Sequence, residues 1–202
     1  MTVRVADVTG VVLCGGAGKR FGGADKPLEL LHGLPLVQHV CERLAAQVAH
    51  VVISCNRNAD TYRRFGDVIV DGITDRGPLA GVLAGMEAAT TDFVFVCPGD
   101  APLLSRTLVA RLRAVLDSTD TDVAYPDDGE QRQHLFMLVR RSLREALSDY
   151  LDAGRRAVHT FVQLQRCAIV DGPFDSDCFT NVNTADDLAQ LAASIPARAR
   201  QQ

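Results

Sequence analysis

The sequence lacks the features that mark several large classes of protein. No apolar run approaches the ~20 residues that a membrane-spanning helix needs, and residues 1–7 show no basic region leading into an apolar core. The formal net charge is −4, whereas nucleic-acid-binding surfaces are usually strongly basic. We therefore expect a cytoplasmic protein with no membrane segment, no secretory signal and no nucleic-acid partner.

Cysteine pairs with metal-ligand spacing are also absent. The six cysteines include no Cys-x-x-Cys pair, and no cluster of Cys and His has the spacing of a zinc site. Cys14, Cys55 and Cys97 lie in or beside apolar runs. This pattern predicts small buried residues in a reducing compartment.

The first half of the chain alternates short apolar runs with amphipathic segments. Continuous runs of β-branched and aromatic residues predict strands covered on both faces, at residues 11–13, 51–53, 68–70 and 93–96. Helical patterns cover residues 36–48, 59–65 and 78–90, and a fourth helix is expected after Ser105 as its N-cap. This alternation predicts an α/β fold of the Rossmann-like, three-layer kind, with a mostly parallel central sheet flanked by helices.

The second half, from Asp117 onward, is less regular. Strands are expected at 123–125, 135–139 and 167–170, and helices at 142–151, at 156–164 and from the cap Thr184 to residue 193. At 202 residues with 47% hydrophobic composition, the chain suits one globular domain. We predict a single domain over 1–195, with a nucleotide-binding half at 9–116, an acceptor-binding half at 117–193 and a frayed tail at 196–202.

A glycine-rich loop follows the first predicted strand, running from Leu13 to Lys26. Glycine backbones can bring their N–H groups close to an anion, and ligands bind at the carboxyl ends of strands in open α/β sheets. The loop does not match the Walker A pattern, because Leu13 and Arg20 occupy its outer positions, nor the dinucleotide pattern, because Phe21 replaces the third glycine. Phosphate is the ligand that this loop predicts.

Lysine occurs only in this loop. The chain contains nineteen arginines but two lysines, Lys19 and Lys26, and both belong to the loop. Lysine and arginine are not interchangeable at a phosphate, where the compact ammonium acts as a point charge. We therefore expect a phosphate contact at Lys26.

A carboxylate follows the fourth predicted strand in the run Cys97-Pro-Gly-Asp100-Ala-Pro. Its position at a strand end places Asp100 at the same edge of the sheet as the glycine-rich loop. Mg²⁺ takes one or two carboxylates and keeps waters or phosphate oxygens, so Asp100 is the expected metal ligand.

Asp71 follows the third strand and is expected at the same edge. Gly77-Pro-Leu-Ala-Gly81 then opens a helix whose N-terminal amides could hold an anion.

Taken together, these motifs resemble the molybdenum cofactor guanylyltransferases. The resemblance lies in Leu13-Cys-Gly-Gly with Arg20 and Asp25-Lys26, in Gly77 to Gly81, in Cys97 to Asp100, and in Phe179-Thr-Asn-Val-Asn-Thr184, all in the family's order and spacing. It implies transfer of GMP from Mg-GTP, with Mg²⁺ or Mn²⁺ as the metal, to the terminal phosphate of molybdenum-molybdopterin. It also implies transient contact with molybdopterin-delivering and molybdoenzyme-maturation proteins.

The same resemblance implies roles for individual residues. Arg20, Lys26 and Asp100 would be catalytic, and Asp100 would hold the metal. The residues expected to contact GTP are Leu13, Cys14, Gly15, Gly16, Lys26, Ser54, Asp71 and Asp100. Asn181 and Asn183 would contact the acceptor. Gln133-His134 departs from a family segment that commonly has proline at its second position, and the sequence leaves the acceptor-side loop open there.

Two rival functions fit the same residues. A cytidylyltransferase acting on the same cofactor, or a sugar-phosphate nucleotidyltransferase, would share the fold, because the preference for guanine follows from the resemblance and not from side-chain chemistry. A nucleotide-binding module without catalysis would keep the loop but would not need Asp100 for turnover. An NAD-dependent dehydrogenase is less well supported, since the dinucleotide pattern is not met.

Overall fold

The computed structural model describes residues 5–15, 25–70, 77–175 and 177–195. Seven strands form one sheet in the order β5-β4-β1-β6-β8-β7-β9, and a two-stranded hairpin of β2 and β3 stands apart from it. The strands are β1 (Val5–Leu13), β2 (Leu30–Leu31), β3 (Leu34–Pro35), β4 (Val48–Ser54), β5 (Asp67–Ile69), β6 (Phe93–Pro98), β7 (Val123–Asp127), β8 (Leu138–Arg140) and β9 (Cys167–Asp171).

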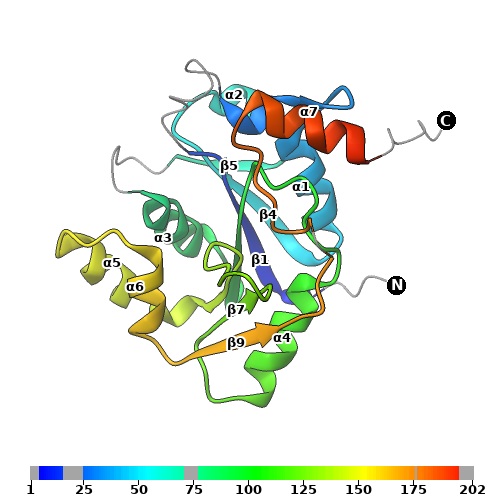
Figure 1. Cartoon of the computed structure of the whole chain (residues 1–202). Helices are drawn as coiled ribbons and strands as arrows, with labels where there is room; N and C mark the ends of the chain where they lie inside the picture. Colours follow the sequence, from blue (N-terminus) through cyan, green and yellow to red (C-terminus); the bar gives the residue numbers. More distant parts are fainter. Residues whose placement is uncertain (1–4, 16–24, 71–76, 176, 196–202) are drawn as a thin grey trace.

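The described helices alternate with these strands (Figure 1). The α-helices are α1 (Leu36–Ala45), α2 (Ala59–Tyr62), α3 (Pro78–Ala88), α4 (Leu108–Ser118), α5 (Arg144–Asp152), α6 (Val158–Gln163) and α7 (Ala185–Ser194), and the short 3₁₀ helices are η2 (Lys26–Leu28) and η3 (Arg141–Leu143). Within the described ranges, no helix has the length and apolar character needed to cross a membrane.

The strand order creates a switch point between β1 and β6. β1 pairs in parallel with both β4 and β6, and from β1 the chain first builds outward through β4 to β5 before it returns to add β6 on the other side. In doubly wound sheets the ligand crevice lies outside the carboxyl ends of the strands at such a point. The segments after Leu13 and Pro98 therefore lie where a ligand is expected.

One strand runs against the rest of the sheet. β8 pairs antiparallel with β6 on one side and with β7 on the other. Because both neighbours oppose β8, β6 and β7 point in the same direction, and their carboxyl ends lie at one edge of the sheet. The mostly parallel sheet predicted from the sequence is therefore confirmed.

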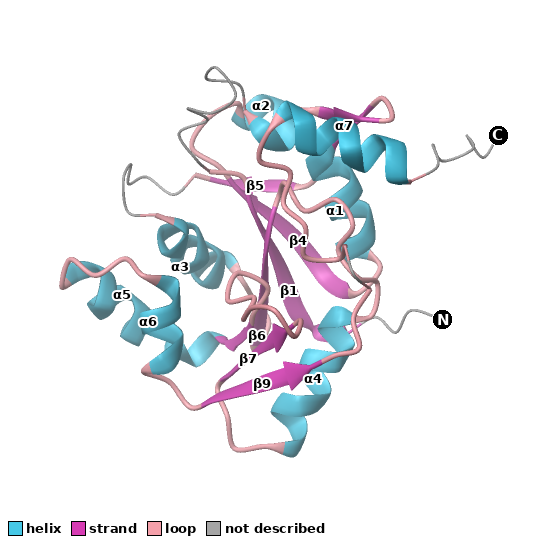
Figure 2. Cartoon of the chain, viewed as in Figure 1, coloured by secondary structure: helices cyan, strands magenta, loops and turns pink. Residues whose placement is uncertain are grey.

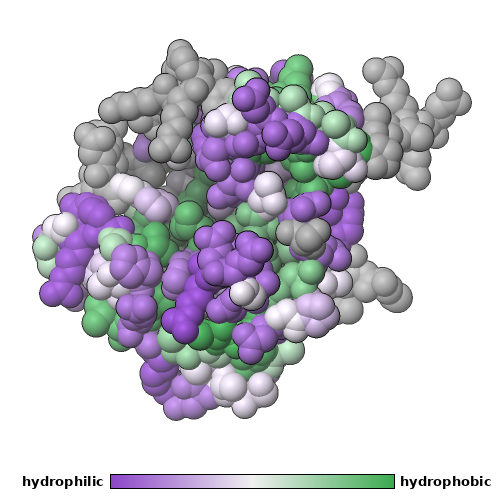
Figure 3. All heavy atoms as spheres, in the orientation of Figure 1, coloured by the Kyte–Doolittle hydropathy of each residue, from purple (hydrophilic) through white to green (hydrophobic). Residues whose placement is uncertain are grey.

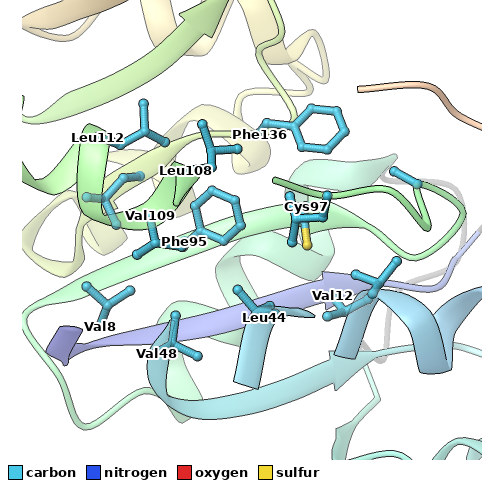
Figure 4. Close-up of a cluster of buried hydrophobic side chains, with 14 of the residues drawn as sticks. Val8, Val12, Leu44, Val48, Phe95, Cys97, Leu108, Val109, Leu112 and Phe136 are labelled. Atoms are coloured by element: carbon cyan, nitrogen blue, oxygen red, sulfur yellow. The ribbon is translucent and has the colours of Figure 1, made fainter. Parts of the chain in front are cut away.

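Helices cover both faces of the sheet (Figure 2). On one face, α1 and α4 pack against side chains such as Val8, Val12 and Phe95, which form the cluster drawn in Figure 4. On the other face, α3, α5 and α6 pack against Val11, Val94 and neighbouring residues. Alternate residues of β1 and β6 thus enter opposite cores, which explains why both strands are apolar without interruption. The solvent side of α5 is hydrophilic, as Figure 3 shows.

Two glycines bring α3 very close to the sheet. A Cβ atom built on Gly85 would lie 2.5 Å from Val11 Cγ2, and one built on Gly81 would lie 2.7 Å from Ser54 Oγ. Real Cβ atoms do not come so near to other heavy atoms, so the present spacing between α3 and the strands β1 and β4 requires glycine at both positions.

The structure corrects three of the boundaries expected from sequence. The helix predicted over 36–48 ends at Ala45, because Val48 begins β4. Ser105 is not the N-cap of α4: the cap position is Thr107, and the backbone N–H of Val109 donates to the side-chain Oε1 of Gln47 at 3.1 Å. The strand predicted over 135–139 begins at Leu138, because a turn closed by the Phe136 N–H and the Gln133 carbonyl precedes it.

The hairpin of β2 and β3 was not expected from the sequence. Each of its strands has two residues, too few to show alternation. With α1 it provides the apolar contacts for the last helix, since Leu31 and Leu36 cluster with Val182 and with Leu191 of α7. The hairpin therefore fixes the C-terminal helix beside the start of α1. The predicted tail at 196–202 lies outside the described residues.

Candidate active site

The site begins where β1 ends, between two neighbouring strands. The N–H of Cys14 donates to the Ser54 carbonyl at 2.8 Å, and the N–H of Gly99 donates to the Leu13 carbonyl at 2.9 Å. A Cβ on Gly99 would lie 2.5 Å from Cys14 Sγ, so only glycine permits this close approach of the two strand ends. The backbone at 13–15 and the turn at 99–100 are therefore held against each other.

Lys26 reaches this edge from a short 3₁₀ turn. η2 starts at Lys26, with Asp25 as its N-cap residue, and Pro27 in its first turn is buried. The N–H groups of Leu28 and Glu29 donate to the carbonyls of Asp25 and Lys26 at 2.8 and 3.0 Å. Proline at the first turn and these two bonds fix the backbone of Lys26.

Two side chains from distant parts of the chain meet at the Lys26 ammonium. Its Nζ lies 3.1 Å from Asp100 Oδ2 and donates to Asn183 Oδ1 at 2.8 Å. The side chains of Lys26 and Asp100 are 24% and 16% exposed, so the pair is partly shielded from solvent and still accessible to a ligand. We call Lys26, Asp100 and Asn183 the edge cluster.

The segment 181–184 is attached to the turn after β6. The backbone N–H of Val182 donates to the Asp100 carbonyl at 2.9 Å. Thr184 then caps α7 through a reciprocal pair of bonds with Asp187, as the sequence predicted for Thr184. Asn181 Oδ1 is buried and has no hydrogen-bond partner among the described residues.

The pKa values of two groups near the edge cluster, Asp187 and Cys14, are shifted. The N–H of Asn183, the Thr184 side chain and the Thr184 N–H lower the pKa of the Asp187 carboxyl, and Lys26 adds a smaller effect in the same direction. Burial raises the pKa of the Cys14 thiol well above its usual range, with smaller contributions from Cys41 and Asp25. The Cys14 thiol is therefore protonated near neutral pH, and its backbone is the part that can face a ligand.

The structure places the other predicted residues as follows. Gly15 is exposed just after β1, whereas Ser54 is 2% exposed and its hydroxyl faces Gly81 of α3. Gly16, Arg20 and Asp71 lie outside the described residues. The six cysteines, all within the described ranges, form no disulfide, and the predicted burial of Cys14, Cys55 and Cys97 is confirmed.

One polar contact at this edge was not expected from the sequence. Asn58 precedes α2 in the left-handed conformation with φ 53°, and its Nδ2 donates to Asp25 Oδ2 at 2.9 Å. Asn tolerates this conformation better than most residues, so an Asn just before a short helix could have indicated the left-handed turn at this position. The contact joins the segment after β4 to the residue before Lys26.

A divalent cation at this site would need ligands from the bound nucleotide in addition to those from the protein. No group of three or more His, Cys, Asp or Glu side chains suited to a metal ion occurs within the described parts of the chain. Asp100 supplies one hard carboxylate at the sheet edge, and Mg²⁺ commonly completes its shell with phosphate oxygens and waters. The donor set thus suits a metal that arrives with a nucleotide.

The sequence and the fold are both similar to known nucleotidyltransferases. Residues 10–167 match the family model described as MobA-like NTP transferase domain. Proteins named molybdenum cofactor guanylyltransferase from Shewanella sp. (strain ANA-3) and Cupriavidus metallidurans are 39% and 40% identical, over 93% and 90% of this chain and 96% and 93% of their own.

Solved structures share the fold. The molybdopterin-guanine dinucleotide biosynthesis protein A of Archaeoglobus fulgidus superposes with a TM-score of 0.77 at 21% identity, covering 92% of this chain and 97% of its own. A nucleotidyl transferase from Methanothermobacter superposes with a TM-score of 0.72 at 19% identity, covering 93% of this chain and 96% of its own. The predicted α/β nucleotidyltransferase fold is therefore confirmed.

Proposed function

The chain belongs to the MobA-like NTP transferase family, and we propose that the edge cluster is its phosphate-transfer centre. The protein is a molybdenum cofactor guanylyltransferase, which transfers GMP from GTP in synthesis of the dinucleotide form of the cofactor. The observation that carries the proposed centre is the 3.1 Å contact between Lys26 and Asp100 at the switch point of the sheet.

The reaction is an in-line displacement at phosphorus. An oxygen of the terminal phosphate of molybdenum-molybdopterin attacks the α-phosphorus of GTP, and the bond from that phosphorus to the bridging oxygen breaks. Pyrophosphate leaves with the bonding electron pair. Because the attacking phosphate is already anionic near neutral pH, no general base is needed, and catalysis consists of positioning and charge stabilisation.

Lys26 and the backbone at 13–15 act on the triphosphate. Gly15, exposed just after β1, allows the backbone to approach phosphate oxygens, and the Lys26 ammonium offsets charge on the leaving pyrophosphate. Arg20 and Asp71 remain proposed nucleotide contacts on the sequence alone. Ser54 is buried against Gly81, so it would act on the nucleotide site by holding the first turns of α3 in place.

Asp100 is the proposed ligand of a divalent cation. Nucleotidyltransferases of this kind use such a metal, and we propose Mg²⁺, with Mn²⁺ as a substitute. When bound, the metal neutralises phosphate charge and polarises the reacting phosphoryl group. Asp100 would be its protein ligand at the end of β6, where Gly99 and the Val182 contact fix the Asp100 backbone.

The acceptor side is proposed at residues 181–183. Asn181 Oδ1 is buried without a described partner, so it is an unsatisfied acceptor, and a bond from a pterin would require its side chain to become accessible. Its neighbour Asn183 contacts Lys26, so the proposed acceptor and donor sites adjoin.

Reconstitution tests the function directly. The purified protein is incubated with molybdopterin, molybdate and Mg²⁺, together with GTP or CTP, and the product is identified by mass. We expect the guanine dinucleotide and stoichiometric pyrophosphate with GTP. A cytosine dinucleotide formed in preference would replace the assigned donor, and nucleotide binding without pyrophosphate release would indicate a non-catalytic module.

A further inference from the structure

Asn183 contacts the nucleotide-side lysine and not only the acceptor side. Its Oδ1 accepts a hydrogen bond of 2.8 Å from Lys26 Nζ, across 157 positions of sequence. The same ammonium lies 3.1 Å from Asp100 Oδ2. Lysine has three N–H donors, and these two oxygens account for two of them.

The Asn183 side chain is held in this orientation. Its backbone N–H donates to Asp187 Oδ2 at 2.8 Å, and its Nδ2 donates to the Asn181 carbonyl at 3.3 Å. Because Nδ2 faces a carbonyl and Lys26 offers only donors, the hydrogen-bond network fixes Oδ1 toward Lys26. The adjacent Val182 N–H ties the segment to Asp100.

The two oxygens at Lys26 differ in what they do to its charge. A carboxylate pairs with the ammonium and neutralises it, whereas an amide oxygen accepts a hydrogen bond and leaves the charge available. A divalent cation bound at Asp100 would also compete with Lys26 for that carboxylate. Lys26 would then keep one protein partner, Asn183, within the described cluster.

We propose that Asn183 is a positioning residue for Lys26, holding the ammonium toward the phosphates when Asp100 exchanges Lys26 for a divalent cation. This inference deepens the proposed function and rests on it. It differs from an acceptor-only role for Asn183, because it predicts an effect on the nucleotide in the absence of molybdopterin.

The scarcity of lysine allows a direct measurement of the contact. In a Lys19→Arg background, Lys26 is the one lysine left in the chain, so ¹⁵N-lysine labelling gives a single ammonium signal. We expect a hydrogen-bonded Lys26 signal in the full-length protein, both alone and with saturating Mg²⁺ and a non-hydrolysable GTP analogue. Asn183→Ala should broaden it by faster exchange, most clearly with Mg²⁺ present. An unchanged signal in Asn183→Ala would overturn the inference.

Nucleotide affinity gives a second readout without acceptor. Asn183→Ala should weaken binding of the Mg²⁺-GTP analogue about tenfold, the scale of one hydrogen bond to a charged group. In a Lys26→Met background the same change should have little further effect, because the two residues act as a unit. Equal losses in both backgrounds, or a loss confined to the KM for molybdopterin, would contradict the proposal.

Asn183→Asp is a control for the ammonium signal alone, since it keeps an oxygen acceptor at this position but adds a negative charge that also pairs with Lys26. It should retain the narrow ammonium signal that Asn183→Ala broadens, and thermal unfolding of both variants checks that the fold is preserved. If Asn183→Ala does not fold, loss of the signal in Asn183→Asp would count against the proposal. If the wild-type protein forms no guanine dinucleotide while the signal and binding behave as expected, the proposed function fails separately.

Discussion

The backbone N–H of Val182 donates a 2.9 Å hydrogen bond to the carbonyl of Asp100. This bond joins the turn after β6 to the segment that leads into α7. The side chains of Asp100 and Asn183 both contact the Lys26 ammonium, and they extend from backbone segments that are hydrogen-bonded to each other. A displacement of one segment should move the other, so the positions of Asp100 and Asn183 are coupled through this backbone hydrogen bond.

Replacing Asp100 by Asn tests the metal ligand. The change keeps the shape of the side chain but removes the charge that a divalent cation needs. We expect turnover to fall by about 100-fold or more, with most of the nucleotide affinity retained, measured by pyrophosphate release and by equilibrium binding. Asp149→Asn, an exposed position on α5, is the matched control. Equal turnover in Asp100→Asn and wild type would remove Asp100 from the metal site.

Gly99→Ala tests the close approach of β1 and β6. The added methyl would lie 2.5 Å from Cys14 Sγ and 3.2 Å from the Leu13 carbonyl oxygen, so the strand ends must separate. We expect a loss of about 1–3 kcal/mol in the free energy of unfolding in urea. In Gly66→Ala the nearest atom would lie 3.4 Å away, an ordinary contact, and the loss should be smaller. Similar losses in the two variants would show that packing at Gly99 is not special.

Thr184→Ala tests the cap that positions Asn183. The variant removes the acceptor for the Asp187 N–H, which is 3.0 Å from Thr184 Oγ1. We expect a cost of about 1 kcal/mol in unfolding free energy, together with weaker nucleotide binding, because Asn183 immediately precedes the cap. Thr180→Ala, at an exposed position in the same segment, serves as the control. Nucleotide affinity equal to that of the wild type would show that the Thr184 cap does not affect the position of Asn183.

His134 gives the protein a pH-dependent stability. Burial lowers the pKa of His134, with smaller contributions from His159 and Arg132, and its ring stacks on Tyr125 with centroids 4.7 Å apart. Since the unfolded chain binds the proton more readily, this contribution is present above pH ~6.5 and is lost as pH falls through the lower folded pKa.

His134→Phe should keep the stacking and remove this titration. We expect its melting temperature to fall less than that of wild type on acidification below pH 6.5. His50→Gln, at an exposed site on β4, controls for loss of a histidine as such. Parallel curves for wild type and His134→Phe would show that His134 does not contribute.

The sequence predicted the sheet well because its central strands are covered on both faces. Val11, Val12, Val94 and Phe95 all enter a core, so their run is apolar without alternation and indicates a buried strand wherever it occurs. The position of Asp100 followed from the same logic, because a residue just after such a strand must lie at the carboxyl edge.

Contacts between distant segments could not be predicted in this way. Gln47 caps α4 through Val109, and Asn183 holds Lys26, yet neither pair leaves a local pattern in the chain. The hairpin of β2 and β3 is too short for periodicity and is fixed by its contacts with α1 and α7. What the sequence missed was decided by tertiary packing and not by local propensity.

The hydrogen atoms of Gly81 and Gly85 set how far α3 stands from the sheet. Any larger group there would shift the whole helix outward as a rigid rod, and with it the first turn at Pro78–Leu79 beside the strand ends. Substitutions at these two positions should therefore change the distance between this first turn and the ends of β1 and β4.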